Sequence, residues 1–163
     1  MTQRIPTITA HGATIPVIGY GTSGMGEVTP EHVATALKLG YRHIDTAWKY
    51  GTERAVGEGM RASGVPRHDI FHCTKVSHEY LHDDAFARSV DESLKTLGVD
   101  YVDLLLVHWP NAKTPLAETM GALAKAQSLQ LETVAAKTGD QLRDIVARAY
   151  AVSPEVRARL RAM

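Results

Sequence analysis

The stretch that decides the fold is Gly40-Tyr-Arg-His-Ile-Asp-Thr-Ala-Trp-Lys-Tyr50. Gly40 ends a predicted helix, because glycine is the residue that most readily takes the left-handed conformation after a helix C-terminus. Residues 41–47 predict a strand. Asp45 lies near the end of that strand, and Tyr50 follows in the next loop. A helix, a strand and then polar side chains past the strand end are typical of a parallel sheet built from βα units.

The same unit recurs along the chain. Thr29-Pro30-Glu31 combines a helix N-cap, a proline at the first helical position and an acid in the first turn. Residues 7–18, with Gly12 near the turn, predict a small hairpin before the first unit. The expected pairs are strand 18–22 with helix 29–39, strand 41–47 with helix 52–62, strand 70–76 with helix 83–97, and strand 102–109 with a helix from 114 to at least 126.

This alternation predicts the α/β fold class with a parallel sheet. A complete (β/α)8 barrel needs ~200 residues or more, and this chain has 163. We therefore predict a partial (β/α)8 TIM barrel of about four parallel strands, with an N-terminal β-hairpin and extra C-terminal helices. The expected C-terminal helices span residues 133–150 and a short segment that begins at Ser153-Pro154.

The composition excludes several classes of partner. Lysine plus arginine equals aspartate plus glutamate at 18 each, so the chain lacks the basic excess of a nucleic-acid-binding protein. No apolar run approaches the ~20 residues of a membrane span, and the first residues have no signal-peptide core. One cysteine permits no internal disulfide. We expect a cytoplasmic protein with no nucleic-acid or membrane partner.

Four ionisable side chains are expected at one rim of the sheet. Asp45, Lys75 and His108 each lie at or near the end of a predicted strand, and Tyr50 follows the first of these strands. Right-handed crossovers bring the ends of parallel strands to the same rim. Strand alternation also places the side chains of Asp45, Lys75 and His108 on one face of the sheet. The four groups therefore predict an active site.

The residue types suit proton donation to a carbonyl oxygen. A phenol has an ordinary pKa near ~10 and is a weak acid at neutral pH, but a nearby ammonium favours the phenolate. A carboxylate beside the ammonium would hold it in place. A histidine can orient a carbonyl oxygen by hydrogen bonding or join the proton relay. Tyr50 as general acid, assisted by Lys75 and Asp45, would protonate the oxyanion that forms when hydride attacks a carbonyl carbon.

At these residues the sequence resembles the aldo-keto reductase family. The motifs that carry the resemblance are Gly-Tyr-Arg-His-Ile-Asp45-Thr-Ala with Tyr50, Glu53 and Val56-Gly57, then Thr74-Lys75, Leu97-Gly98-Val-Asp-Tyr-Val-Asp103-Leu and His108-Trp-Pro110. The resemblance covers roughly residues 5–126. It implies an eight-stranded barrel that reduces an aldehyde or a ketone with NADPH. We expect an aldo-keto reductase-like half barrel over residues 1–126 and a divergent helical tail over residues 127–163 that packs on the same domain.

The resemblance assigns roles to individual residues. Asp45, Tyr50, Lys75 and His108 match the family's catalytic tetrad. Gly21, Thr22 and Asp45 match positions that contact the nicotinamide end of the cofactor, and Trp109 falls where the family lines its substrate pocket. The later family motifs for the rest of the cofactor site are not recognisable in this chain. Substrate identity and the choice between NADPH and NADH stay open.

An alternative function stays open beside the reductase. A sheet of four parallel strands would expose two edges and its apolar inner face. The chain would then be a catalytically silent half barrel that acts in self-association or in a complex with a partner that completes the barrel. We predict a possible homodimer through the open sheet edges.

No metal site is expected. The histidines at positions 68, 72, 78 and 82 are predicted to be surface residues, because their spacing does not make them converge as metal ligands must. Cys73 precedes Lys75 by two residues, and no neighbouring base in the sequence activates it. We expect Cys73 to be a packing residue.

Overall fold

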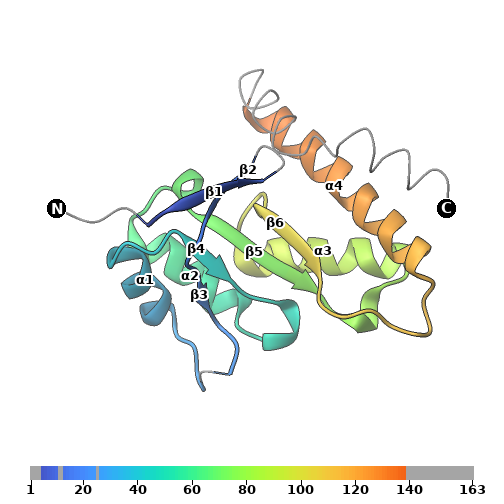
Figure 1. Cartoon of the computed structure of the whole chain (residues 1–163), viewed down its shortest axis with the longest axis horizontal. Coiled ribbons are helices and arrows are strands. Elements are labelled where there is room, and N and C mark those ends of the chain that lie inside the picture. Colours follow the sequence, from blue (N-terminus) through green and yellow to red (C-terminus); the bar gives the residue numbers. More distant parts are fainter. Residues whose placement is uncertain (1–4, 11–12, 25, 139–163) are drawn as a thin grey trace.

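The computed structural model describes residues 5–10, 13–24 and 26–138. Two sheets form the framework (Figure 1). The strands are β1 (Thr7–Ala10), β2 (Ala13–Pro16), β3 (Tyr20–Gly21), β4 (His43–Asp45), β5 (Phe71–Val76) and β6 (Leu104–Val107). The helices are α1 (Pro30–Lys38), α2 (Glu53–Ser63), α3 (Asp83–Leu97) and α4 (Leu116–Thr138), with the 3-10 turns η1 (Trp48–Tyr50), η2 (Arg67–Asp69) and η3 (His78–Tyr80). No helix within these residues combines the length and the apolar character needed to cross a membrane.

The main sheet is parallel, in the order β3-β4-β5-β6, so each strand lies beside its neighbour in the sequence. Helices return the chain between successive strands, as parallel pairing requires. In the register of the sheet, Asp45 pairs with Gly21 on one side and with Cys73 on the other. Lys75 pairs with Leu106. These residues share one face of the sheet because side chains alternate along a strand.

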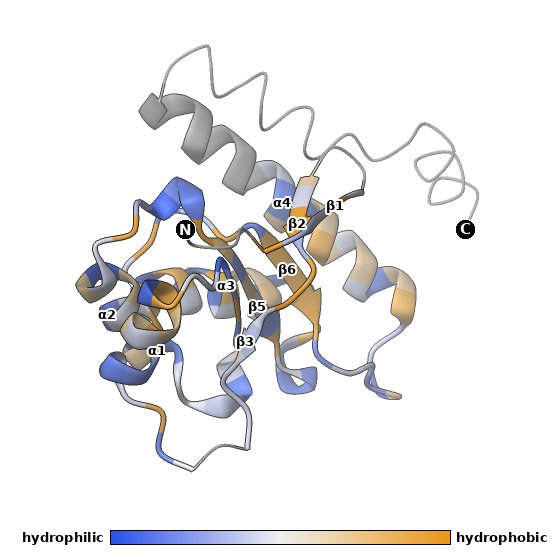
Figure 2. Ribbon diagram, turned by 60° about the vertical axis from the view of Figure 1, so that its left-hand side comes forward, coloured by the Kyte–Doolittle hydropathy of each residue, from blue (hydrophilic) through white to orange (hydrophobic). Residues whose placement is uncertain are grey.

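The opposite face of the sheet is covered by the helices. Ile44, His72, Thr74 and Val76 point to that side and are at most 2% exposed. Two apolar clusters lie beneath the helices. The first contains Val28, Val33, Leu37, Ile44, Val56, Met60, Ile70, Leu97 and Val102. The second contains Val76, Leu81, Phe86, Val90, Ala122 and Ala126. Figure 2 shows hydrophobic colouring along β6, whose residues are Leu104–Val107.

The β1–β2 hairpin packs at the amino end of the parallel sheet. The Nδ1 atom of His43 lies 3.2 Å from the carbonyl oxygen of Pro16, and the His43 ring meets Phe71 edge-on. A Cβ atom at Gly19 would lie 3.1 Å from the His43 ring. Glycine at this position therefore lets the chain pass close to His43 between the hairpin and β3. The hairpin leaves the carboxyl ends of the strands open.

The predicted fold class is confirmed, and so is the order of its elements. The strands are shorter than expected, because several predicted strand residues lie in the connecting turns. α4 continues without a break to Thr138, so residues 133–138 end that helix and do not begin a new one. The predicted helices beyond residue 138 lie outside the described residues. The predicted boundary between residues 126 and 127 falls inside α4 and stays a prediction.

The prediction that His72 is a surface residue is wrong. Its side chain is 0% exposed, because position 72 lies on the helix-covered face of β5. Within the described part of the chain, neither ring nitrogen of His72 has a hydrogen-bond partner. Burial, with smaller contributions from Arg67 and His43, lowers the pKa of His72 from 6.5 to about 3. The native protein therefore holds a neutral imidazole in its core.

We predict that His72 makes the fold acid-sensitive. Below pH 6.5 the unfolded chain binds a proton at His72 that the native chain rejects until about pH 3. The free energy of unfolding should therefore fall with decreasing pH by about 1.4 kcal/mol per pH unit from this residue. His72→Leu should remove this slope in denaturant titrations between pH 7 and pH 4. His68→Leu is the matched control, because the His68 ring is exposed. An unchanged slope in His72→Leu would contradict the prediction.

Candidate active site

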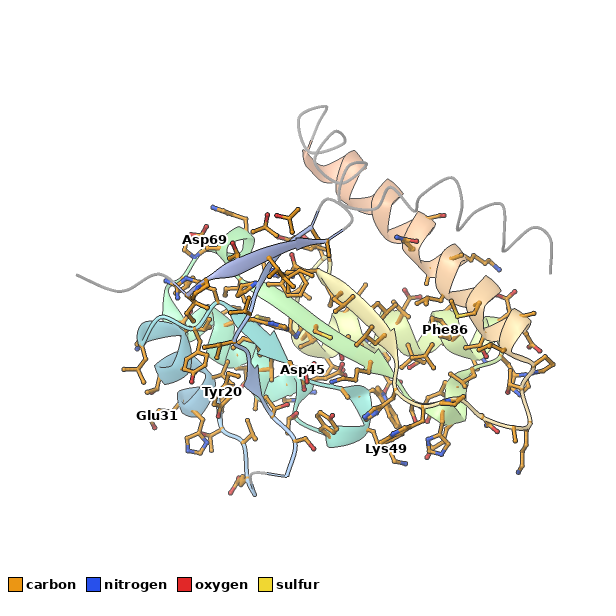
Figure 3. All side chains as sticks on the ribbon, viewed as in Figure 1. Tyr20, Glu31, Asp45, Lys49, Asp69 and Phe86 are labelled. Carbon is orange, nitrogen blue, oxygen red and sulfur yellow. The ribbon has the colours of Figure 1, made fainter. Side chains whose placement is uncertain are left out.

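The four predicted site residues meet at the carboxyl ends of β4, β5 and β6. Asp45 is the last residue of β4, and Lys75 is the last but one of β5. His108 follows β6 directly, and its amide donates to the carbonyl oxygen of Val76 at 2.9 Å. Tyr50 ends η1, the turn that follows β4. Figure 3 labels Asp45 and, on η1, Lys49, which marks this rim of the sheet.

Lys75 is the centre of the cluster. Its Nζ atom donates to Oδ1 of Asp45 at 2.8 Å and to the carbonyl oxygen of Thr46 at 2.8 Å. The Lys75 side chain is 13% exposed and that of Asp45 is 38% exposed, so the ion pair lies at the edge of the solvent. Two acceptors from the adjacent strand end therefore fix the ammonium group on the inner face of the sheet.

Tyr50 leans over the ammonium group. The Nζ atom of Lys75 lies 5.1 Å from the centroid of the Tyr50 ring. The ring also meets His108 edge-on, with 5.3 Å between ring centroids and an interplanar angle of 79°. Gly51, with a φ angle of 68°, turns the chain away directly after Tyr50 and into α2. The phenol is thus held between the lysine and the histidine.

His108 carries a neutral ring near pH 7. Burial first, and then the charge of Lys75, lower the pKa of His108, while the charge of Asp45 opposes the shift. Its Nδ1 atom is buried and has no partner among the described residues. A neutral imidazole offers one N–H donor and one acceptor, so His108 can hydrogen-bond a carbonyl oxygen. Trp109 stacks on the ring at 3.6 Å and is 50% exposed on the rim.

Buried polar side chains lie behind the rim, on the helix-covered face of the sheet. The amino-acid sequence alone predicted no role for them. Glu53, in the first turn of α2, accepts a hydrogen bond at 2.7 Å from the hydroxyl of Thr74, the neighbour of Lys75. Burial raises the pKa of Glu53, while hydrogen bonds from Thr74 and Ser93 oppose the rise. The presence of Glu53 in the family motif was the one available signal. Its partners come from β5 and α3, which only the tertiary structure brings together.

The two glycine-motif positions differ in what they offer a cofactor. Gly21 is exposed beside Asp45, and a Cβ atom built there would have no neighbour within 4 Å. The Thr22 side chain is 2% exposed. Its hydroxyl bonds the hydroxyls of Thr46 at 2.9 Å and Thr52 at 3.0 Å, on the helix-covered side. Open space at Gly21 leaves room for the flat end of a cofactor, whereas the hydroxyl of Thr22 is already bonded and its amide donates to the carbonyl oxygen of Asp45 at 3.0 Å.

The described residues give no indication of a reactive thiol or a metal site at the rim. Burial first, and then the charge of Asp45, raise the pKa of the Cys73 thiol to about 12. The thiol therefore stays protonated at neutral pH, as a packing residue would. Within residues 5–10, 13–24 and 26–138, no group of three or more histidine, cysteine, aspartate or glutamate side chains could hold a metal ion.

Comparisons with known proteins place the sequence in a family. The family model described as Aldo/keto reductase family matches residues 17–129. The chain is 47% identical over 116 residues to a methylglyoxal reductase of Escherichia coli O157:H7, a match that covers 69% of this chain and 43% of that protein. It is 50% identical over 105 residues to the glycerol 2-dehydrogenase (NADP(+)) of Saccharomyces cerevisiae. This match covers 64% of this chain and 33% of that protein.

Solved structures match the fold as well as the sequence. An aldo/keto reductase from Brucella melitensis superposes with a TM-score of 0.73 at 36% identity, covering 86% of this chain and 60% of that chain. An aldo-keto reductase of Bombyx mori, solved in complex with NADP, superposes with a TM-score of 0.69 at 35% identity. The match covers 78% of this chain and 48% of that chain.

The chain spans about half the length of the curated relatives it matches. The matched region nevertheless includes all four strands of the parallel sheet and the whole Asp45–Tyr50–Lys75–His108 cluster. Since the family model covers more than half of the sequence and the fold agrees with the solved relatives, the chain belongs to the aldo/keto reductase family.

Proposed function

We propose that this chain carries the proton-transfer centre of an NADPH-dependent reductase that converts an aldehyde or a ketone to an alcohol. The observation that carries the proposal is the cluster around Lys75, whose Nζ atom lies 2.8 Å from Asp45 and 5.1 Å from the Tyr50 ring centroid. The relatives named for methylglyoxal and glycerol support a small carbonyl substrate or its alcohol. A cytoplasmic setting is part of the proposal.

The chain's own residues would stabilise and then neutralise the negative charge that develops on the carbonyl oxygen. When bound, NADPH supplies the hydride for the carbonyl carbon. Tyr50 donates its phenolic proton to the oxygen, so that hydride plus proton gives the alcohol. The ammonium of Lys75 stabilises the phenolate that remains, and Asp45 holds that ammonium in place. Neutral His108 orients the substrate oxygen with its N–H donor.

Recognition groups for cofactor and substrate flank this centre. The space over Gly21 and the carboxylate of Asp45 would receive the nicotinamide end of the cofactor, together with the backbone of Thr22. Trp109, exposed on the rim and stacked on His108, would form one wall of the substrate site. Aromatic side chains suit this place because they bury apolar substrate surface at little entropic cost.

Tyr50→Phe should abolish the reductase activity while leaving the fold intact. It removes the donated proton but keeps the ring that contacts Lys75 and His108. Loss of a general acid typically costs 10²- to 10⁴-fold, so we expect kcat to fall by about 100-fold or more. The measurement is NADPH oxidation with a panel of small aldehydes and ketones. Tyr101→Phe, which removes a hydroxyl at the opposite end of the sheet, is the matched control. Retained activity in Tyr50→Phe would overturn the assignment.

Cofactor binding can be tested without turnover. The chain has two tryptophans, Trp48 and Trp109, and both lie at the rim, so bound NADPH should quench their fluorescence. Gly21→Val should weaken the saturable quenching by about 10-fold or more, because the added side chain fills the space beside Asp45. Gly121→Val is the control, since it also meets no atom within 4 Å but lies on α4. Equal titrations of both variants would contradict this cofactor position.

A second proposal concerns the open sheet, which also supports the non-catalytic alternative. Within the described residues, β3 and β6 each pair with one neighbour only, which leaves two free edges. Leu106, on the inner face of β6, is 38% exposed. Unpaired apolar edge strands favour further pairing. We propose that two copies associate through these edges, either to complete a reductase or as a catalytically silent assembly. A different polypeptide that completes the barrel is the competing occupant.

Leu106→Lys should weaken this self-association. The lysine places a charge on the inner face next to the free edge, where it must be desolvated in the dimer. Sedimentation velocity at tens of micromolar should show a dimer for the unaltered chain and more monomer for Leu106→Lys. Ala62→Lys is the control, because it places the same charge on the exposed side of α2. A purely monomeric profile of the unaltered chain would exclude the homodimer.

A further inference from the structure

We propose that η3, a turn that carries none of the four site residues, is a positioning element that holds the Tyr50 turn and the His108 loop in register with Lys75. The inference rests on the reductase function proposed above and adds residues to that site. η3 lies between the other two rim segments in space, since β5, which it follows, is flanked by β4 and β6. Each flank of η3 makes two contacts with a neighbouring segment.

The first flank ties η3 to η1. Trp48 and Tyr80 meet edge-on, with ring centroids 4.9 Å apart and an interplanar angle of 84°. Lys49 and Glu79 form a direct ion pair beside these rings. Both η1 partners immediately precede Tyr50, so the position of the phenol depends on these two contacts. The ion pair is 42% exposed on both sides and contributes little, so the ring pair is the stronger link.

The second flank ties η3 to the segment after β6. The side-chain amide of Asn111 donates to the carbonyl oxygen of His78 at 2.9 Å. The rings of His78 and Trp109 meet at 5.9 Å, and Trp109 stacks on His108 at 3.6 Å. The hydrogen bond from Asn111 therefore restrains the loop on which His108 and Trp109 stand.

η3 is itself anchored to the core. Ser77 is 0% exposed, and its side-chain oxygen accepts from the amide of Glu79 at 3.4 Å. The amide of Tyr80 donates to the carbonyl oxygen of Ser77 at 3.0 Å. Leu81 is 1% exposed and belongs to the apolar cluster under α3 and α4. The turn therefore inherits its position from β5, the strand that carries Lys75.

This arrangement explains how three loops reach a common geometry. The Tyr50 ring contacts Lys75 and His108, and the Trp48–Tyr80 ring pair adds a contact that joins η1 to η3. Productive proton transfer needs reacting groups held within a fraction of an ångström. Because η3 directly follows β5, the strand that carries Lys75, and contacts both flanking segments, it sets the distances from Lys75 to Tyr50 and to His108.

Backbone amide exchange tests the inference without turnover. The amides of Tyr50 and Gly51 donate to Ala47 and Trp48 within η1, and the amide of His108 donates to Val76. Tyr80→Ala should speed exchange at Tyr50 and Gly51 by roughly 2- to 10-fold, the equivalent of one lost aromatic pair. Asn111→Ala should speed exchange at His108. Tyr80→Phe, which keeps the ring pair, should restore slow exchange. Amides in α2 should be unaffected in all three variants.

Steady-state kinetics give the second readout. Tyr80→Ala should lower kcat by roughly 10-fold with little change in KM, because substrate contacts are kept while the proton donor is misplaced. Unchanged exchange at Tyr50 in Tyr80→Ala and at His108 in Asn111→Ala would overturn the inference. If the Tyr80→Ala variant unfolds, amide exchange at His108 in Asn111→Ala alone tests the inference. If the unaltered chain has no reductase activity, the proposed function fails, whereas the exchange data still decide whether η3 positions the rim.

Discussion

The ion pair between Lys75 and Asp45 is the interaction on which the rest of the rim depends. It joins the ends of two neighbouring strands, β4 and β5, and it is partly withdrawn from water. Its two charges also add to pKa shifts that burial mainly causes in two neighbouring residues. Lys75 contributes to the lowered pKa of His108, and Asp45 contributes to the raised pKa of Cys73. One pair thus favours a neutral imidazole and an unreactive thiol beside a charged ammonium.

The support for this pair lies on the other face of the same strands. Because side chains alternate, the residue beside Lys75 points toward the helices, where Thr74 donates to the buried Glu53. Thr22, Thr46 and Thr52 bond one another through their hydroxyls on that side as well. A buried carboxylate is costly unless it accepts hydrogen bonds, so Glu53 ties α2 to β5 in a specific register. The polar layer behind the sheet therefore fixes the strand ends that carry the charged groups in front.

In the described residues the site is open to solvent. The hairpin packs on the inner face of the sheet at its amino end, at His43, while Leu106 on the same face of β6 is 38% exposed. Asp45 is 38% exposed and Trp109 is 50% exposed. Solvent screens charges at such a rim more strongly than in an enclosed pocket. A cover over the inner face would therefore strengthen the electrostatic interactions of Lys75, which links the proposed assembly with the proposed activity.

The amino-acid sequence by itself determined the element order, the α/β class, the hairpin and the four residues of the rim. These follow from local rules, namely helix caps, glycine stops such as Gly98 and the alternation of side chains along strands. Strand ends were less predictable, since Trp109 has strand propensity yet lies past the end of β6. Only the tertiary structure decided that His72 is buried, that the Thr22 hydroxyl faces the helices, and that Glu53 meets Thr74. It also revealed the contacts of η3 with Trp48 and Asn111. Each of these depends on residues more than 20 positions apart, and the local pattern of a single segment holds no information about such partners.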